Sequence, residues 1–183
     1  MKKIQKIKLS RKPTYRKLGH SIDFFKLFKK IERRFDTCFI LESLGEQGTF
    51  SRYSIIGFDP ERIISSSDIS FAELRAMMPS RTIAKHYAGG LIGYMSYEAV
   101  NYFEPSLRLK PHPDFEQFLF GVYTDGIIFD KLTNEILYFY YDRDRSHVVQ
   151  KMLKAKDVTV KAHIKFLGNS ITKKEFMDVV GRV

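Results

Sequence analysis

The sequence has few residues that could form disulfides or bind metal ions. There is one cysteine among 183 residues, so no intrachain disulfide can form. Cys38 stands in the apolar run 38–41, which is typical of a buried structural thiol and indicates a reducing compartment. The five histidines are scattered singly, and none has a second ligand at metal-binding spacing. We therefore expect no metal site and no catalytic metal within the chain.

Long apolar runs are also missing. No stretch approaches the roughly 20 residues of a membrane-spanning helix, and the N-terminus lacks the apolar core of a secretory signal. We therefore expect a cytoplasmic protein without membrane association.

Motifs for nucleotide and ester chemistry are missing as well. The glycines of the segment 89–93 lack the G-x-G-x-x-G spacing of a dinucleotide site, and no Gly-Lys-Ser/Thr follows them. No G-x-S-x-G elbow is present. The glycines are better explained by close backbone packing.

The positive charge gathers at one end of the chain. The formal net charge is +10, but eight Lys and Arg residues precede Asp23, the first acidic residue. The rest of the chain is left at about +2. Clustered basic residues supply most non-specific affinity for nucleic acid, so a nearly neutral body argues against nucleic acid as a partner. A basic nucleic-acid-binding module remains a less favoured alternative.

Local patterns predict short helices and strands without regular βαβ alternation. Apolar residues at helical spacing predict a helix that starts behind Ser21 as N-cap, with Asp23 in its first turn. The other expected elements are strands over 37–42, 50–57 and 62–65, a helix over 71–78, a helical turn over 97–103, apolar strand runs over 118–129 and 135–141 joined as a hairpin by 131–134, a helix over about 144–156 and a strand over 158–166. This order favours an α+β fold, mainly antiparallel sheet with flanking helices.

The C-terminal residues predict the beginning of another helix. Thr172 and Glu175 have the spacing of a capping box, and the apolar positions Phe176, Val179 and Val180 follow it. No C-cap signal precedes the last residue, Val183. We therefore expect the chain to be a fragment whose last helix opens a further structural unit.

One segment has the residue types that recognise a small zwitterion. Glu42 and Ser43 can accept from an ammonium group, and Arg52 can donate to a carboxylate. Phe50 and Tyr53 can form walls for an apolar side chain, and Ser51 lies between them. The alternative is that Arg52 and Glu42 form a cross-strand contact with a purely structural role.

Several blocks of this sequence resemble the opening domain of anthranilate synthase component I and of the related aminodeoxychorismate synthase component I. The matching blocks, in order, are 39–43, 51–60, 89–98, 102–104 and 128–130, and the capped helix at Thr172 resembles the first helix of the chorismate-binding domain. The resemblance implies a basic segment over 1–20, an N-terminal domain over 21–168 and the start of a truncated chorismate-binding domain over 169–183.

The resemblance also implies a function. The large subunit of this family uses chorismate, Mg²⁺ and ammonia from a glutamine amidotransferase subunit to form anthranilate and pyruvate, with its catalytic residues in the C-terminal domain. The opening domain is expected to help form the amidotransferase docking surface and a feedback site for L-tryptophan. The positions that match that site are Glu42, Ser43, Phe50, Ser51, Arg52 and Tyr53. The para-aminobenzoate branch is the alternative, and the intact Glu42-Ser43 pair favours anthranilate synthase.

Overall fold

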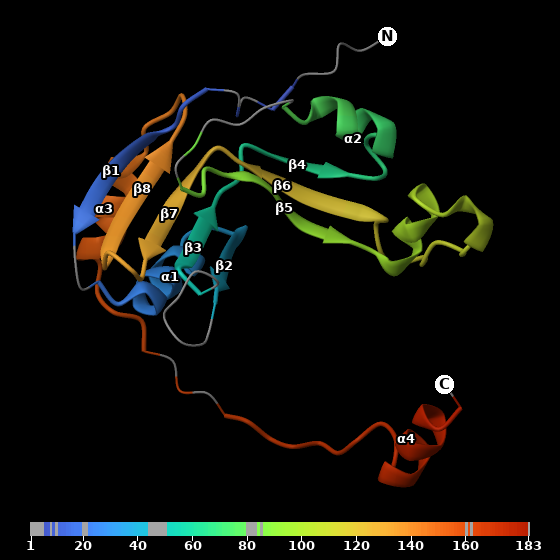
Figure 1. The fold of residues 1–183 in the computed structure, drawn as a ribbon. Coiled ribbons are helices and arrows are strands. Elements are labelled where there is room, and N and C mark those ends of the chain that lie inside the picture. Colours follow the sequence, from blue (N-terminus) through green and yellow to red (C-terminus); the bar gives the residue numbers. More distant parts are fainter. Residues whose placement is uncertain are drawn as a thin grey trace.

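Two antiparallel sheets with flanking helices form the body of the protein (Figure 1). This computed structural model describes residues 6–7, 9, 11–19, 22–43, 51–79, 84, 86–159, 161 and 163–182. The expected α+β class and the dominance of antiparallel sheet are confirmed.

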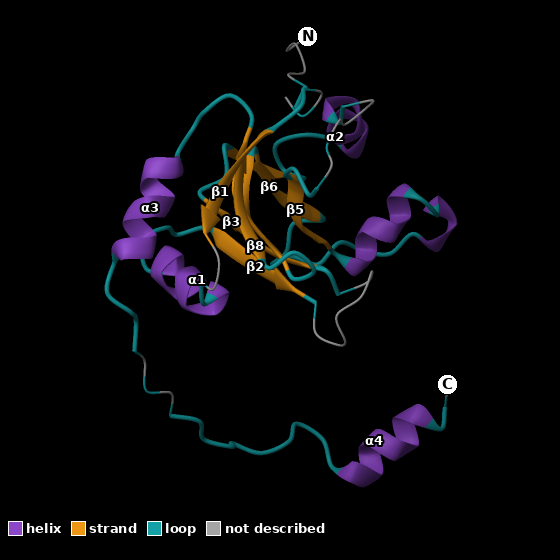
Figure 2. Ribbon diagram, turned by 60° about the vertical axis from the view of Figure 1, so that its left-hand side comes forward, coloured by secondary structure: helices purple, strands orange, loops and turns teal. Residues whose placement is uncertain are grey.

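The first sheet has five strands in the order β1-β8-β7-β3-β2. Its strands are β1 (Thr14–Gly19), β2 (Cys38–Glu42), β3 (Tyr53–Phe58), β7 (Asp125–Asp130) and β8 (Glu135–Tyr140). Helices α1 (Phe24–Glu32) and α3 (Ser146–Lys154) cover one face of it, as Figure 2 shows. Alternate strand residues such as Ile56 and Tyr138 pack there against Leu27 and Val149, and this contact forms the main core.

The second sheet has three strands in the order β4-β6-β5. These are β4 (Arg62–Ser65), β5 (Gly90–Met95) and β6 (Phe118–Tyr123), with helix α2 (Phe71–Met77) packed on them. Ile64, Leu74 and Phe118 belong to a second buried cluster between the sheet and this helix. Strands β5 and β6 continue into an arm that ends in the short 3-10 helices η1 (Tyr97–Tyr102) and η2 (Pro105–Leu107) (Figure 1).

The expected apolar strand over 118–129 is two strands in different sheets. It is interrupted at Thr124, so that β6 belongs to the second sheet and β7 to the first. The chain also crosses between the sheets from β3 to β4, through a turn in which Asp59 has a φ of 47°. Apolarity alone cannot show where such a run changes sheet. The hairpin of β7 and β8 through residues 131–134 is confirmed.

Gly93 shows why glycines occupy β5. A Cβ atom there would lie 1.9 Å from the carbonyl oxygen of Leu119 on β6, far inside van der Waals contact. Gly89 is similarly restricted, because its φ is +80° and a Cβ atom added to it would lie 2.2 Å from the Tyr123 carbonyl oxygen. The expectation of close backbone packing is confirmed at both positions.

Two local predictions require correction, for the N-cap of α1 and for the burial of Cys38, and β1 is a strand that the sequence patterns do not assign. Asp23, not Ser21, is the N-cap of α1, because its side chain accepts a hydrogen bond from the Lys26 amide at 2.9 Å; Ser21 lies outside the described residues. The basic N-terminal segment contains β1, which pairs with β8. Cys38 is only partly buried, at the edge strand β2, and burial raises the pKa of its thiol.

The strand expected over 158–166 is not present among the residues described there. Ile164 and Phe166 are 94% and 78% exposed, so this part of the chain has no sheet against which an alternating pattern could be buried. A strand needs a pairing partner, and the pattern by itself does not supply one.

The C-terminal helix α4 (Lys173–Val180) forms as predicted, and Thr172 and Glu175 make both bonds of the capping box. The helix ends at Val180 with Gly181 as its C-cap, so the expectation that no C-cap precedes Val183 is wrong. Glycine is the residue type that most often ends a helix. Its apolar residues stay accessible, with Phe176 at 55% and Val179 at 57% exposed. Figure 1 shows α4 away from the two sheets, after an extended connection.

Candidate functional site

The candidate effector residues meet at one end of the first sheet. Glu42 is the last residue of β2, Ser43 follows it, and Tyr53 begins β3 on the neighbouring strand. The antiparallel register pairs Glu42 with Ser54, so the two short segments 42–43 and 51–54 lie side by side. Ser51 is buried, and Phe50 lies outside the described residues. The predicted proximity of the two segments is therefore confirmed for the described positions.

Arg52 binds Asp130 rather than Glu42. Its Nε donates to the two carboxylate oxygens at 3.0 and 3.1 Å, and its Nη2 donates to Oδ2 at 2.6 Å. Asp130 ends β7 and is 1% exposed, and the hydrogen bonds from Arg52 lower the pKa of its carboxyl group. Glu42 instead accepts a hydrogen bond from Ser54 Oγ at 3.4 Å. The expected Arg52–Glu42 contact is therefore absent from this structure.

The register of the central strands explains this choice of partner. Tyr53 pairs with Asp130, because β3 lies between β2 and β7. The residue before Tyr53 is thus placed at the end of β7, where a buried carboxylate requires a cation. The sequence could not show that β7 would be the neighbour of β3, since the two strands are far apart in the chain.

Lys131 is a site residue that sequence reasoning missed. Its ammonium group donates to the main-chain carbonyl oxygen of Ser43, and its main-chain amide donates to the carbonyl oxygen of Arg52 at 2.8 Å. One residue of the β7–β8 turn therefore contacts both segments of the site. A lysine in a hairpin turn ordinarily indicates a solvated side chain, and the only available signal was its position directly after the matching block 128–130.

Aromatic residues from three parts of the chain extend the site along the sheet. The guanidinium of Arg52 lies 4.9 Å from the centre of the Tyr53 ring. The hydroxyl of Tyr53 lies 3.3 Å from His86 Nδ1, and the His86 ring meets that of Tyr15 edge-on at 5.3 Å. Tyr15 also donates to the main-chain oxygens of His86 and Tyr87, at 3.4 and 3.3 Å, and burial raises the pKa of its phenol.

These groups suit the recognition of a small zwitterion. The site combines carbonyl, hydroxyl and carboxylate acceptors, two cations and aromatic surface, which are the groups that an amino acid requires. Within the described part of the chain, no group of three His, Cys, Asp or Glu side chains could hold a metal ion. The described residues of this site therefore do not fit Mg²⁺.

A cavity of about 380 Å³ lies elsewhere, at the junction between the two sheets, and its walls include Asp59, Asp125 and Arg145. These charges already bind one another, with Arg145 Nη1 2.5 Å from Asp59 Oδ2 and Nη2 2.6 Å from Asp125 Oδ1. Asp59, Asp125 and Arg145 are thus already paired with one another within the protein. The strand ends at Ser43 and Arg52 are the better candidate for a ligand.

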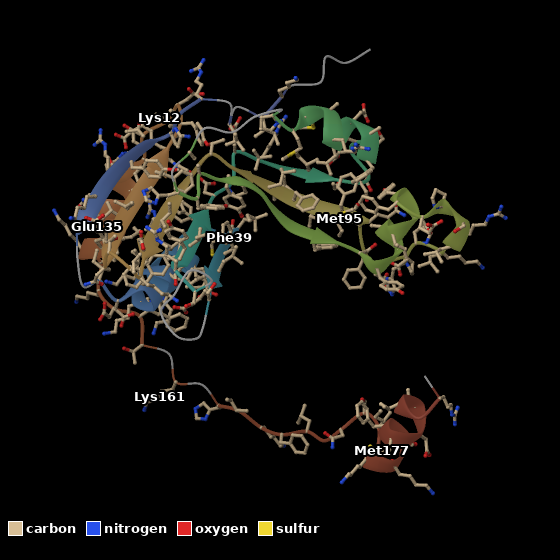
Figure 3. All side chains as sticks on the ribbon, viewed as in Figure 1. Lys12, Phe39, Met95, Glu135, Lys161 and Met177 are labelled. Atoms are coloured by element: carbon tan, nitrogen blue, oxygen red, sulfur yellow. The ribbon has the colours of Figure 1, made fainter. Side chains whose placement is uncertain are left out.

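Exposed apolar side chains gather at the arm and at α4. Figure 3 labels Met95 towards the tip of the arm and Met177 on α4. The exposed large apolar residues of the arm and its tip are Tyr94, Met95, Tyr97, Phe103, Leu107 and Phe115. Several exposed apolar side chains on one element are typical of a surface that contacts other protein. None of the helices formed by the described residues has the length and apolarity to cross a bilayer.

Comparison with known proteins identifies relatives that share most of this chain. Residues 36–182 match the family described as chorismate binding enzyme. Anthranilate synthase component 1 of Leptospira biflexa is 39% identical over 165 residues, which is 82% of this chain and 36% of that protein. The proteins of the same name from Methanothermobacter thermautotrophicus and Methanothermobacter marburgensis are 30% and 31% identical, and each match covers 85% of this chain and 37% of the relative.

The chain thus spans little more than a third of the length of these relatives. The family match, however, extends from before β2 to the end of α4 and includes every strand of the two sheets except β1. The resemblance seen in the sequence blocks is thereby confirmed. The chain belongs to the chorismate binding enzyme family and is related to anthranilate synthase component 1.

Proposed function

We propose that this chain is the regulatory and docking part of an anthranilate synthase large subunit, a cytoplasmic lyase of tryptophan biosynthesis. The whole enzyme converts chorismate and ammonia to anthranilate and pyruvate. The proposal is supported by relatives that all carry the name anthranilate synthase component 1. It includes the division into a basic segment (1–20), an N-terminal domain (21–168) and the start of a chorismate-binding domain (169–183).

The proposed regulatory ligand is L-tryptophan, bound at the ends of β2 and β3. The main support for this proposal is that the segments 42–43 and 51–53 lie side by side. Two cations, Arg52 of the second segment and Lys131 of the β7–β8 turn, lie at the same place. Ser43 Oγ would accept from the ligand ammonium, and Glu42 adds negative charge nearby. Tyr53 offers aromatic surface for the indole ring. Ser51 and Phe50 complete the proposed set.

The proposed protein partners are the glutamine amidotransferase subunit and the subunit's own C-terminal chorismate-binding domain. The arm and α4 each carry several exposed apolar side chains. Because such groups are typical of contacts with other protein, they support two contacts of this kind. The last helix would dock through Phe176 and Val179 into the chorismate-binding domain. The arm tip, around Tyr97 and Phe103, would contact a second protein surface.

Catalysis and Mg²⁺ are proposed to belong to the full-length subunit outside this chain. The described residues contain no group of three His, Cys, Asp or Glu side chains that could hold a metal ion. What this part of the subunit does is bind the effector and present surfaces for assembly.

The basic N-terminal segment supports sheet packing more than nucleic-acid binding. Arg16 pairs with Asp144 at 2.8 Å, and Lys17 pairs with Glu135 at 2.6 Å. Arg11 also lies 3.0 Å from Asp142. Positive charge that is matched in this way is less available to phosphates.

The deciding experiment is an assay of the full-length subunit with its amidotransferase, chorismate, glutamine and Mg²⁺. We expect anthranilate and pyruvate, and inhibition of both by tryptophan. Formation of aminodeoxychorismate would assign the protein to the para-aminobenzoate branch instead. Anthranilate formation that tryptophan does not inhibit would contradict the regulatory part of the proposal while leaving the reaction intact.

A further inference from the structure

We propose that Lys131 supplies the cation that binds the carboxylate of the effector, while Arg52 remains bound to Asp130. This inference rests on the proposed tryptophan site and specifies how that site distinguishes an amino acid from an amine. It assigns a binding role to a residue of the β7–β8 turn, outside the set that the sequence indicated.

Arg52 already has a partner within the protein. Its Nε and Nη2 face both oxygens of Asp130, a carboxylate that is 1% exposed. Turning this edge of the guanidinium towards a ligand would leave a buried carboxylate without its cation, which is strongly unfavourable. Arg52 therefore acts as a strut between the start of β3 and the end of β7.

Lys131 lies next to Ser43. Its ammonium donates to the main-chain oxygen of Ser43, the residue whose hydroxyl is proposed to accept from the ligand ammonium. The ammonium and carboxylate of an amino acid share one carbon atom, so their protein partners must lie within a few ångströms of each other. Lys131 and Ser43 meet this condition.

The ammonium group of Lys131 has more hydrogen-bond donors than its bond to Ser43 uses. A lysine ammonium carries three donors, and one is directed at Ser43. Within the described residues, no carboxylate forms an ion pair with Lys131, and the adjacent Asp130 is engaged by Arg52. A ligand carboxylate would therefore meet an ammonium that has donors to spare and is already held in place.

The test compares ligands that differ by one charged group. Tryptophan, tryptamine, which lacks the carboxylate, and indole-3-propionate, which lacks the ammonium, are titrated calorimetrically into the full-length subunit and into its Lys131→Met variant. We expect Lys131→Met to weaken tryptophan and indole-3-propionate about tenfold to hundredfold and to leave tryptamine within about twofold. Lys131→Arg should restore most of the loss.

Two further variants make the result specific. Lys17→Met removes a lysine of the same sheet, one that pairs with Glu135, and should change no affinity. Arg52→Gln should lower the melting temperature. It should also weaken the binding of every ligand, each by the same factor, as expected of a residue with a structural role.

Three results would contradict the inference. If Lys131→Met weakens tryptophan and tryptamine equally, Lys131 only holds the strand ends together, and the inference is overturned while the effector site stands. Unchanged tryptophan affinity in Lys131→Met overturns the inference as well. If the unmodified subunit binds none of the ligands, the proposed effector function fails and the inference fails with it.

Discussion

Arg145 and Asp125 form a two-pronged ion pair at the point where β6 becomes β7. Arg145 Nε donates to Asp125 Oδ2 at 2.8 Å, and Nη2 donates to Oδ1 at 2.6 Å. The same guanidinium donates to Asp59 in the crossing from β3 to β4. One side chain at the start of α3 therefore connects both places where the chain passes between the sheets, and fixes how the arm leaves the body.

The loss of one partner of this pair should destabilise the protein. Arg145 and Asp125 are 8% and 5% exposed, so Arg145→Met leaves a buried carboxylate unpaired. We expect the free energy of unfolding to fall by about 3–5 kcal/mol, measured by urea denaturation. The double variant Arg145→Met/Asp125→Asn should recover part of this loss. A loss below about 1 kcal/mol in the single variant would show that the pair is not needed.

A substitution at Gly93 tests the close approach of β5 and β6 in the arm. Gly93→Ala places a methyl group against the Leu119 carbonyl oxygen and should separate β5 from β6, lowering the melting temperature by several degrees. The control is Gly181→Ala, where the nearest atom is 3.4 Å from the new Cβ and little change is expected. Equal melting temperatures for the two variants would refute the close approach.

Asp130 should make the stability of the folded protein depend on pH, with stability falling at acidic pH. Hydrogen bonding from Arg52 lowers the pKa of Asp130 in the folded protein below the unfolded value of about 3.9. Its contribution to stability is therefore present above about pH 4 and is lost as the pH falls through the folded pKa. Asp130→Asn removes this contribution.

Urea denaturation of both proteins from about pH 7 to about pH 2 provides the measurement. The stability difference between wild type and Asp130→Asn should be constant near neutral pH and should shrink below about pH 4. A difference that stays constant over the whole range would show that the pKa of Asp130 is not coupled to folding.

Ser43→Ala separates regulation from structure. The hydroxyl is lost, but the main-chain oxygen that binds Lys131 remains, so the strand ends keep their contact. We expect the tryptophan inhibition constant of the full-length enzyme to rise about tenfold to hundredfold, corresponding to about 1–3 kcal/mol. Turnover and melting temperature should stay close to the wild-type values. A lowered melting temperature beside an unchanged inhibition constant would assign Ser43 a structural role only.

The chain alone should not consume chorismate. Purified residues 1–183, supplied with chorismate, Mg²⁺ and ammonia, should release no pyruvate above background, because the proposed catalytic residues lie outside this chain. The full-length subunit serves as the positive control in a lactate dehydrogenase-coupled assay. Pyruvate release by the isolated chain would place catalytic groups within it.

Local features of the sequence predicted much of the fold correctly. The capping box at Thr172, the hairpin through residues 131–134 and the helical spacing of Phe24, Leu27 and Ile31 each depend on residues close together in the chain. Such signals act through neighbouring backbone groups, so they form whatever the rest of the protein does. The pairing of β2 with β3 also follows from their closeness in sequence.

What the sequence by itself determined is therefore the class of fold, the position of most elements and the two segments of the candidate site. Only the tertiary structure decided that residues 118–129 divide between two sheets, that Thr14–Gly19 joins the first, and that Arg52 binds Asp130, 78 residues away. These outcomes depend on which strands become neighbours. That choice is made by burying whole faces together, a condition that no local pattern contains.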